Sequence, residues 1–198
     1  MEERGNWKIK TSKKVYENPW ISVDHHEVID PSGKDGLYGL VHFKNKALAV
    51  LPIDSDLNTY IVGQFRFATN EYSWEVPEGG GTLQLSSERE ALRELKEETG
   101  IQADSLYPFL EMHLSNSVTD EKSKSFVAFD LNMNPPQPDT TEKITVRKVA
   151  LGELFGMVEK GLIKDALSVA SLMRLELILL KNQLSTYEQV KNWFTLHS

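Results

Sequence analysis

The sequence of 198 residues predicts an α/β fold in which a mixed β-sheet lies between helices, with an N-terminal antiparallel β-hairpin region. Apolar, strand-like segments alternate imperfectly with segments of helical periodicity, a pattern typical of this class. The composition is globular, with 40% hydrophobic and 26% charged residues, and the length suffices for one core. We expect the hairpin region at residues 1–45 and the main domain at residues 46–198.

The hairpin region takes its name from two strand-like segments. Residues 20–29 and 37–43 have strand patterns, and the segment 31–36, rich in turn residues, predicts the connection between them. An isolated hairpin buries too little surface to be stable alone. We therefore expect it to pack on the rest of the chain or on a second copy of the chain.

The main domain begins with an apolar strand at residues 47–53, followed by a turn and a returning strand at 59–62. Three glycines, residues 79–81, predict a loop that leads into a helix at 87–99. Ser87 and Glu90 have the spacing of a capping box, and Gly100 ends the helix.

The remaining segments continue the mixed pattern. In order, the sequence predicts strands at 105–114, 124–133 and 144–151, a helix at 151–158 and a last long helix from about residue 165.

The helix at 87–99 has an unusual distribution of carboxylates. At about 100° per residue, four of them share one arc of about 80°: Glu90, Glu94, Glu97 and Glu98. The apolar stripe of Ala91, Leu92 and Leu95 lies beside this arc, whereas Lys96 and Arg89 lie on the back of the helix. The carboxylates therefore border a buried surface.

A solvated acidic face is the plain alternative for such a cluster. However, like charges three and four residues apart destabilise a helix, and a glycine-rich loop immediately precedes this one. The clustering is explained if a divalent cation supplies the missing positive charge. Mg²⁺ prefers oxygen ligands and commonly bridges carboxylates to substrate phosphates.

Composition and charge exclude several classes of protein. With no cysteine, the chain has no disulfide, thiolate zinc site or cysteine nucleophile. The net charge of −7 disfavours nucleic-acid binding, so a bound metal would have to attract an anionic substrate. The N-terminus has no apolar signal segment, and Arg174 and Glu176 interrupt the apolar stretch 167–180, so we expect a cytoplasmic protein without a membrane span.

The segment 79–101 resembles the Nudix box. Its second half, residues 93–101 (Arg-Glu-Leu-Lys-Glu-Glu-Thr-Gly-Ile), matches in full, whereas Leu85 stands where the family has a glutamate. The flanks resemble the ADP-ribose and nucleotide-sugar pyrophosphatase branch of the Nudix hydrolases. The segments that carry this wider resemblance are 16–24, 64–66, 75–80, 115–121 and 165–168.

This resemblance implies the Nudix fold and Mg²⁺-dependent hydrolysis of a diphosphate in ADP-ribose or a related nucleoside diphosphate sugar, with Mn²⁺ as a substitute metal. The products are a nucleoside monophosphate and a sugar phosphate. By the same resemblance, Glu94 and Glu98 are the core metal ligands, Glu97 shares a second ion, and the Glu78 main-chain carbonyl adds an oxygen. Arg93 is implied to hold the glutamates in place.

The resemblance also implies roles outside the box. Glu142, on a loop before a late strand, is our choice of general base, with Glu121 and Glu97 as competitors. Arg66 is a candidate diphosphate clamp, and Trp20 a candidate for stacking on the nucleobase. In relatives the N-terminal hairpin is exchanged across a homodimer, so we expect a homodimer here.

Two other functions remain open. An RNA 5′-end pyrophosphohydrolase would need a basic RNA track, which the net acidity disfavours. A noncatalytic domain that binds nucleotide sugars would be expected to have lost metal ligands, yet Glu94, Glu97 and Glu98 are all present.

Overall fold

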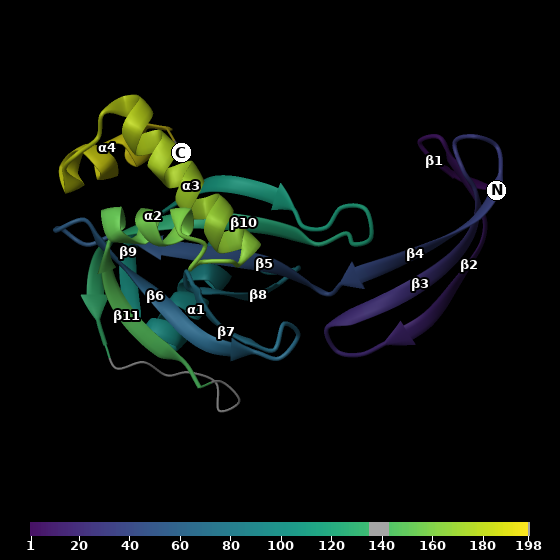
Figure 1. Cartoon of the computed structure of the whole chain (residues 1–198), viewed down its shortest axis with the longest axis horizontal. Helices are drawn as coiled ribbons and strands as arrows, with labels where there is room; N and C mark the ends of the chain where they lie inside the picture. The colour runs from purple at the N-terminus through teal and green to yellow at the C-terminus, as the bar shows by residue number, and fades with distance from the viewer. Residues whose placement is uncertain (135–142, 198) are drawn as a thin grey trace. The chain divides into compact units, whose positions relative to one another are not determined.

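The computed structural model describes residues 1–134 and 143–197 (Figure 1). By its internal contacts the chain divides into two units. The first comprises Met1–Lys46 and Met112–Lys122, and the second comprises Ala47–Glu111 and Ser123–Ser198. Within the described residues, no helix combines the length and the apolar character needed to cross a membrane.

The first unit is built on one antiparallel sheet with the strand order β1-β2-β3-β4. Its strands are β1 (Glu2–Arg4), β2 (Trp7–Glu17), β3 (Ile21–Ile29) and β4 (Asp35–Phe43). The predicted hairpin is β3–β4, whereas β1 and β2 are additional strands. In β2 only Ile9 is buried, so its sequence does not show the apolar alternation that identifies a strand.

The segment 112–122 is attached to β4 within this unit. Thr119 forms a parallel bridge with Val41, and the Asp120 carboxylate accepts the Phe43 backbone N–H at 3.0 Å. The other Asp120 oxygen lies 2.6 Å from His42 Nδ1. These contacts fix the segment that carries Glu121.

The second unit contains two sheets, with strand orders β8-β5-β10-β9 and β11-β6-β7. The strands are β5 (Asn45–Pro52), β6 (Asn58–Arg66), β7 (Glu71–Glu75), β8 (Glu78–Thr82), β9 (Ile101–His113), β10 (Lys122–Met133) and β11 (Thr145–Ala150). β5 and β10 are parallel, and β6 is antiparallel to both of its neighbours. The strand predicted to return after β5 is therefore in a different sheet, and the glycine triplet predicted as a loop lies in β8.

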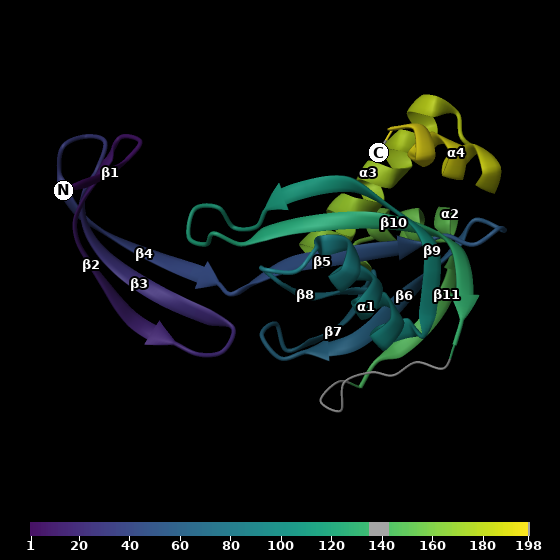
Figure 2. The ribbon, with the colours of Figure 1, turned by 180° about the vertical axis from the view of Figure 1, so that it is seen from behind.

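Helices cover both faces of the four-stranded sheet. The helices of the second unit are α1 (Ser87–Thr99), α2 (Leu151–Glu159), α3 (Ala166–Asn182) and α4 (Tyr187–His197), shown from two sides in Figures 1 and 2. Of these, α2 lies against β11 and α3. On one face, Leu48 and Val50 of β5 share a buried cluster with Ala91 and Leu95 of α1.

The opposite face of the same sheet meets the C-terminal helices. Ser125 of β10 is hydrogen-bonded to Ser171 of α3, and Phe129 packs on Tyr187 and Phe194 of α4. Phe126 of β10 belongs to the cluster that contains α1, whereas its neighbour Ser125 contacts α3. Because successive residues of a strand point to opposite faces, α1 and α3 lie on opposite sides of β10. The predicted sandwich of a mixed sheet between helices is confirmed.

The last predicted helix is interrupted. It starts as expected, with Asp165 as N-cap, but it ends at Gln183, whose φ of 53° is left-handed. Tyr187 then begins the separate helix α4.

Candidate active site

The N-cap of the helix α1 lies one residue earlier than predicted. Ser86 is the N-cap, and its hydroxyl accepts the Arg89 backbone N–H at 3.1 Å. The predicted capping box of Ser87 and Glu90 is therefore wrong. Glu90 is buried and accepts the Thr82 backbone N–H instead, which ties α1 to β8. The helix ends at Gly100 as predicted, with a φ of 76°.

Arg93 gathers the carboxylates of α1. Its Nη2 lies 2.6 Å from Glu94 and 3.3 Å from Glu90, and its Nη1 lies 2.6 Å from Glu97. Burial opposes the charge of Arg93, but the neighbouring carboxylates prevail and raise its pKa. Arg93 therefore offsets the negative charge of the acidic arc. Among the described residues, neither Arg89 nor Lys96 forms an ion pair with these carboxylates.

Two carboxylates of α1 meet the backbone at the start of β8. Glu98 is only 4% exposed, and its Oε2 accepts the Glu78 backbone N–H at 3.0 Å. The Glu94 carboxylate lies against Gly79, where an added Cβ would stand 2.3 Å from Glu94 Cδ. Glycine is therefore required for this close approach.

The same arrangement is suited to a divalent cation. The carboxylates of Glu94 and Glu98 both approach the start of β8, Glu98 at the Glu78 N–H and Glu94 beside Gly79, and they offer oxygen ligands there. Hard cations such as Mg²⁺ prefer such ligands. Glu97 is more exposed and is held by Arg93. These residues fit the implied metal, and the individual ligand assignments remain predictions.

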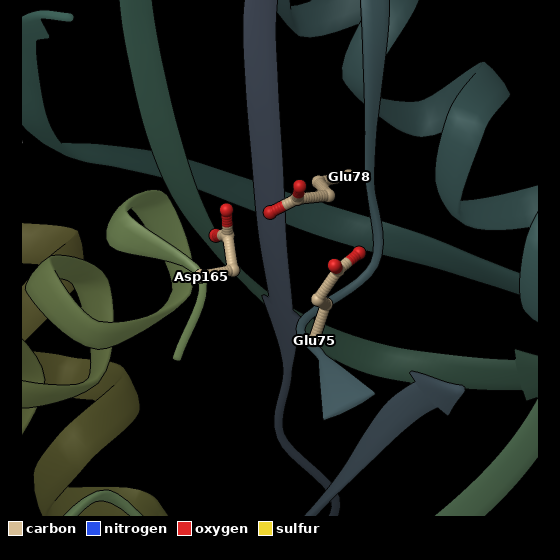
Figure 3. A group of neighbouring side chains, drawn as sticks. All are labelled: Glu75, Glu78 and Asp165. Atoms are coloured by element: carbon tan, nitrogen blue, oxygen red, sulfur yellow. The ribbon is translucent and has the colours of Figure 1, made fainter. Parts of the chain in front are cut away.

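The Glu78 side chain belongs to a second acidic group. Carboxylate oxygens of Glu75, Glu78 and Asp165 lie within 4.8 Å of one another, and Figure 3 shows the three side chains converging from β7, β8 and the start of α3. Burial, and then the charges of Asp165 and Glu75, raise the pKa of Glu78 well above its usual value, against the opposing effect of Arg66.

The sequence carries only an indirect sign of this second group. Glu75 and Asp165 stand in the flanking segments that resemble the Nudix branch, but no local pattern marks either as a site residue, and the resemblance implies a role for the Glu78 carbonyl only. Side chains that are far apart in the sequence meet here because β7, β8 and α3 end or begin at one place.

Arg66 belongs to this acidic group. Its Nε lies 2.9 and 3.1 Å from the two Glu75 oxygens, and its Nη2 contacts Glu75 and lies 3.2 Å from Glu78 Oε1. The hydrogen bonds that Arg66 donates to Glu75 are the main cause of the raised pKa of Arg66. The predicted diphosphate clamp is thus held by carboxylates, and its role toward a phosphate remains a prediction.

The remaining predicted site residues are Trp20, Glu121 and Glu142. Trp20 is exposed and Glu121 is half-buried, and both belong to the first unit. Burial, assisted by the charge of Asp120, raises the pKa of Glu121. Glu142 lies outside the described residues.

Comparison with known proteins finds several proteins to which this chain is similar. Residues 7–41 match the model of the nucleoside diphosphate sugar hydrolase N-terminal domain. The chain is 28% identical to the ADP-ribose pyrophosphatase of Bacillus subtilis over 174 residues, which cover 86% of this chain and 92% of the relative. It is 30% identical to the Nudix hydrolase P35G2.12 of Schizosaccharomyces pombe over 129 residues, covering 60% and 62% of the two chains.

The chain is thus similar to ADP-ribose pyrophosphatases and to a Nudix hydrolase. A solved structure described as an ADP compounds hydrolase has the same fold, with a TM-score of 0.80, 20% identity, and coverage of 91% of this chain and 98% of the other. The resemblance to the Nudix hydrolases is therefore confirmed, and the segment that resembles the Nudix box lies in β8 and α1.

Proposed function

We propose that this Nudix hydrolase cleaves the diphosphate bond of ADP-ribose or a related nucleoside diphosphate sugar, in a reaction that depends on Mg²⁺ and accepts Mn²⁺. The products are a nucleoside monophosphate and a sugar phosphate. The observation that carries the proposal is the convergence of Glu94 and Glu98 on the backbone of Glu78 and Gly79. The near full-length similarity to an ADP-ribose pyrophosphatase supports the substrate class.

A bound divalent cation would offset charge on the diphosphate oxygens and lower the pKa of a water molecule. Glu94, Glu98 and the Glu78 carbonyl would hold one ion, and Glu97 would share a second. Arg93 keeps Glu94 and Glu97 oriented by charge-assisted hydrogen bonds of 2.6 Å.

Each predicted residue outside the box has a role in the proposed reaction. Glu142 accepts the proton of the attacking water, and Glu121 and Trp20 contact the substrate. Arg66 binds the diphosphate. Because its guanidinium is shared between Glu75 and Glu78, a phosphate must replace part of those contacts. Arg66 keeps its charge throughout, because an arginine side chain is not deprotonated in proteins.

We further propose that residues 1–45 form the dimerisation region. Sedimentation of the purified chain is then expected to give about twice the monomer mass, and deletion of residues 1–45 to give a monomer. A fully active monomer from the intact chain would contradict this part of the proposal.

A substrate panel tests the reaction itself. ADP-ribose, GDP-mannose, UDP-glucose, capped RNA and triphosphorylated RNA are each incubated with the protein, with and without Mg²⁺. We expect release of a nucleoside monophosphate from at least one of the first three, and no release when EDTA replaces the metal. Turnover of the RNAs alone would favour the RNA 5′-end reaction, and binding without turnover would favour a noncatalytic sensor.

A further inference from the structure

Ser168 is a fully buried hydroxyl in the second unit, three residues after the N-cap of α3. The Asp165 side chain accepts the Ser168 backbone N–H at 2.7 Å, which is an ordinary helix cap. The Ser168 hydroxyl is directed away from the helix. It accepts the Val76 backbone N–H at 3.1 Å and donates to Glu78 Oε2 at 3.3 Å.

The segment that Ser168 contacts is also held at its other residues. The Pro77 carbonyl accepts the Val50 backbone N–H of β5 at 2.9 Å, and the Glu78 N–H donates to Glu98 at 3.0 Å. Val76 and Pro77 are buried, so water does not replace a lost partner there. This set of bonds therefore holds the backbone of Val76–Glu78, which leads directly into the peptide unit between Glu78 and Gly79.

We infer that Ser168 is a positioning residue for the metal site, acting through the backbone of Val76–Glu78 on the Glu78 carbonyl and the Glu98 carboxylate. This inference rests on the proposed function. The Ser168 hydroxyl joins the start of α3 to Val76 and Glu78, between β7 and β8. Glu78 in turn contacts Glu98 of α1, so this segment links α3 to α1. Partners of this kind typically change metal affinity about tenfold to a hundredfold.

A matched pair of serine variants separates this role from general packing. Ser171, one turn further along α3, is equally buried, and its hydroxyl lies 2.7 Å from Ser125 Oγ on β10. Ser168→Ala and Ser171→Ala each remove one buried hydroxyl from the same helix, but only the first touches the Val76–Glu78 segment. Thermal unfolding checks that both variants fold.

The readout is the Mn²⁺ dissociation constant of the substrate-free protein, measured by electron paramagnetic resonance of free Mn²⁺. We expect Ser168→Ala to bind Mn²⁺ about tenfold or more weakly than the parent and Ser171→Ala to bind it as the parent does. Equal affinity in Ser168→Ala, or equal weakening in Ser171→Ala, overturns the inference while the proposed function stands. A parent chain that binds no Mn²⁺ overturns both.

A second variant covers the case in which Ser168→Ala does not fold. Ser168→Cys keeps nearly the same shape with a weaker hydrogen-bonding group, and the chain has no other cysteine with which it could pair. We expect Mn²⁺ binding to weaken in the same direction. Parent affinity in this variant would also overturn the inference.

Discussion

Replacement of Gly79 by alanine probes the metal site without replacing a charged residue. Gly79 does not have a positive φ, so alanine fits the backbone conformation. Its new Cβ would stand 2.3 Å from Glu94 Cδ and 2.4 Å from Glu94 Oε2. The only way to relieve this overlap at low cost is for the Glu94 carboxylate to swing away, because it is the end of a flexible side chain.

The size of the effect follows from these distances. Carbon atoms in contact are separated by about 3.5 Å, so the carboxylate must move by more than about 1 Å. A misplacement of about 1 Å in a catalytic group costs on the order of a hundredfold in rate. Stability should change by less than about 1 kcal/mol, because the partly exposed pair with Arg93 contributes little and alanine restricts the unfolded chain.

The assay is ADP-ribose hydrolysis at saturating Mg²⁺, together with Mn²⁺ binding and thermal unfolding. Gly156→Ala in α2 is the control, because its added Cβ has no heavy atom within 4 Å. We expect Gly79→Ala to lose about a hundredfold or more in kcat and to bind Mn²⁺ more weakly, and Gly156→Ala to retain parent activity. If Gly79→Ala turned over normally, Glu94 would not be positioned for catalysis by this close approach.

Three further variants test other parts of the account. Glu98→Gln should lower turnover by orders of magnitude with little loss of stability, since its amide oxygen still accepts the Glu78 N–H; near-normal rates would defeat the metal assignment. Glu142→Gln should lower kcat more than it changes KM, and an unaltered rate would transfer the base role to another carboxylate. Lys191 is the main cause of the lowered pKa of Asp130, so this carboxylate adds stability above about pH 4 that is lost as pH falls through its lowered pKa. Asp130→Asn should therefore be less stable than the parent at pH 7. In denaturant titrations its free energy of unfolding should fall less than that of the parent on acidification; identical pH profiles would rule this out.

Much of the second unit can be predicted from the sequence because local signals and burial agree there. The apolar run of β5 and the periodic face of α1 pack against each other, and Gly100 takes the left-handed conformation that the helix end requires. The nine-residue match at 93–101 is specific enough to indicate the family by itself.

Other features depend on tertiary contacts that no local pattern carries. The mostly exposed strand β2 has no apolar face to reveal it. Glu90 does not form the predicted capping box because Thr82, brought close by β8, offers its backbone N–H to the buried carboxylate. The grouping of Glu75, Glu78 and Asp165 arises only when the ends of three elements meet.

The central claim is that the acidic face of α1 holds a divalent cation against a diphosphate. Crystals soaked with Mg²⁺ and a non-hydrolysable ADP-ribose analogue test it most directly. We expect Mg²⁺ at about 2.1 Å from oxygens of Glu94 and Glu98, with the analogue's diphosphate completing its coordination. Unliganded carboxylates still paired with Arg93, and no ion between them, would contradict the account.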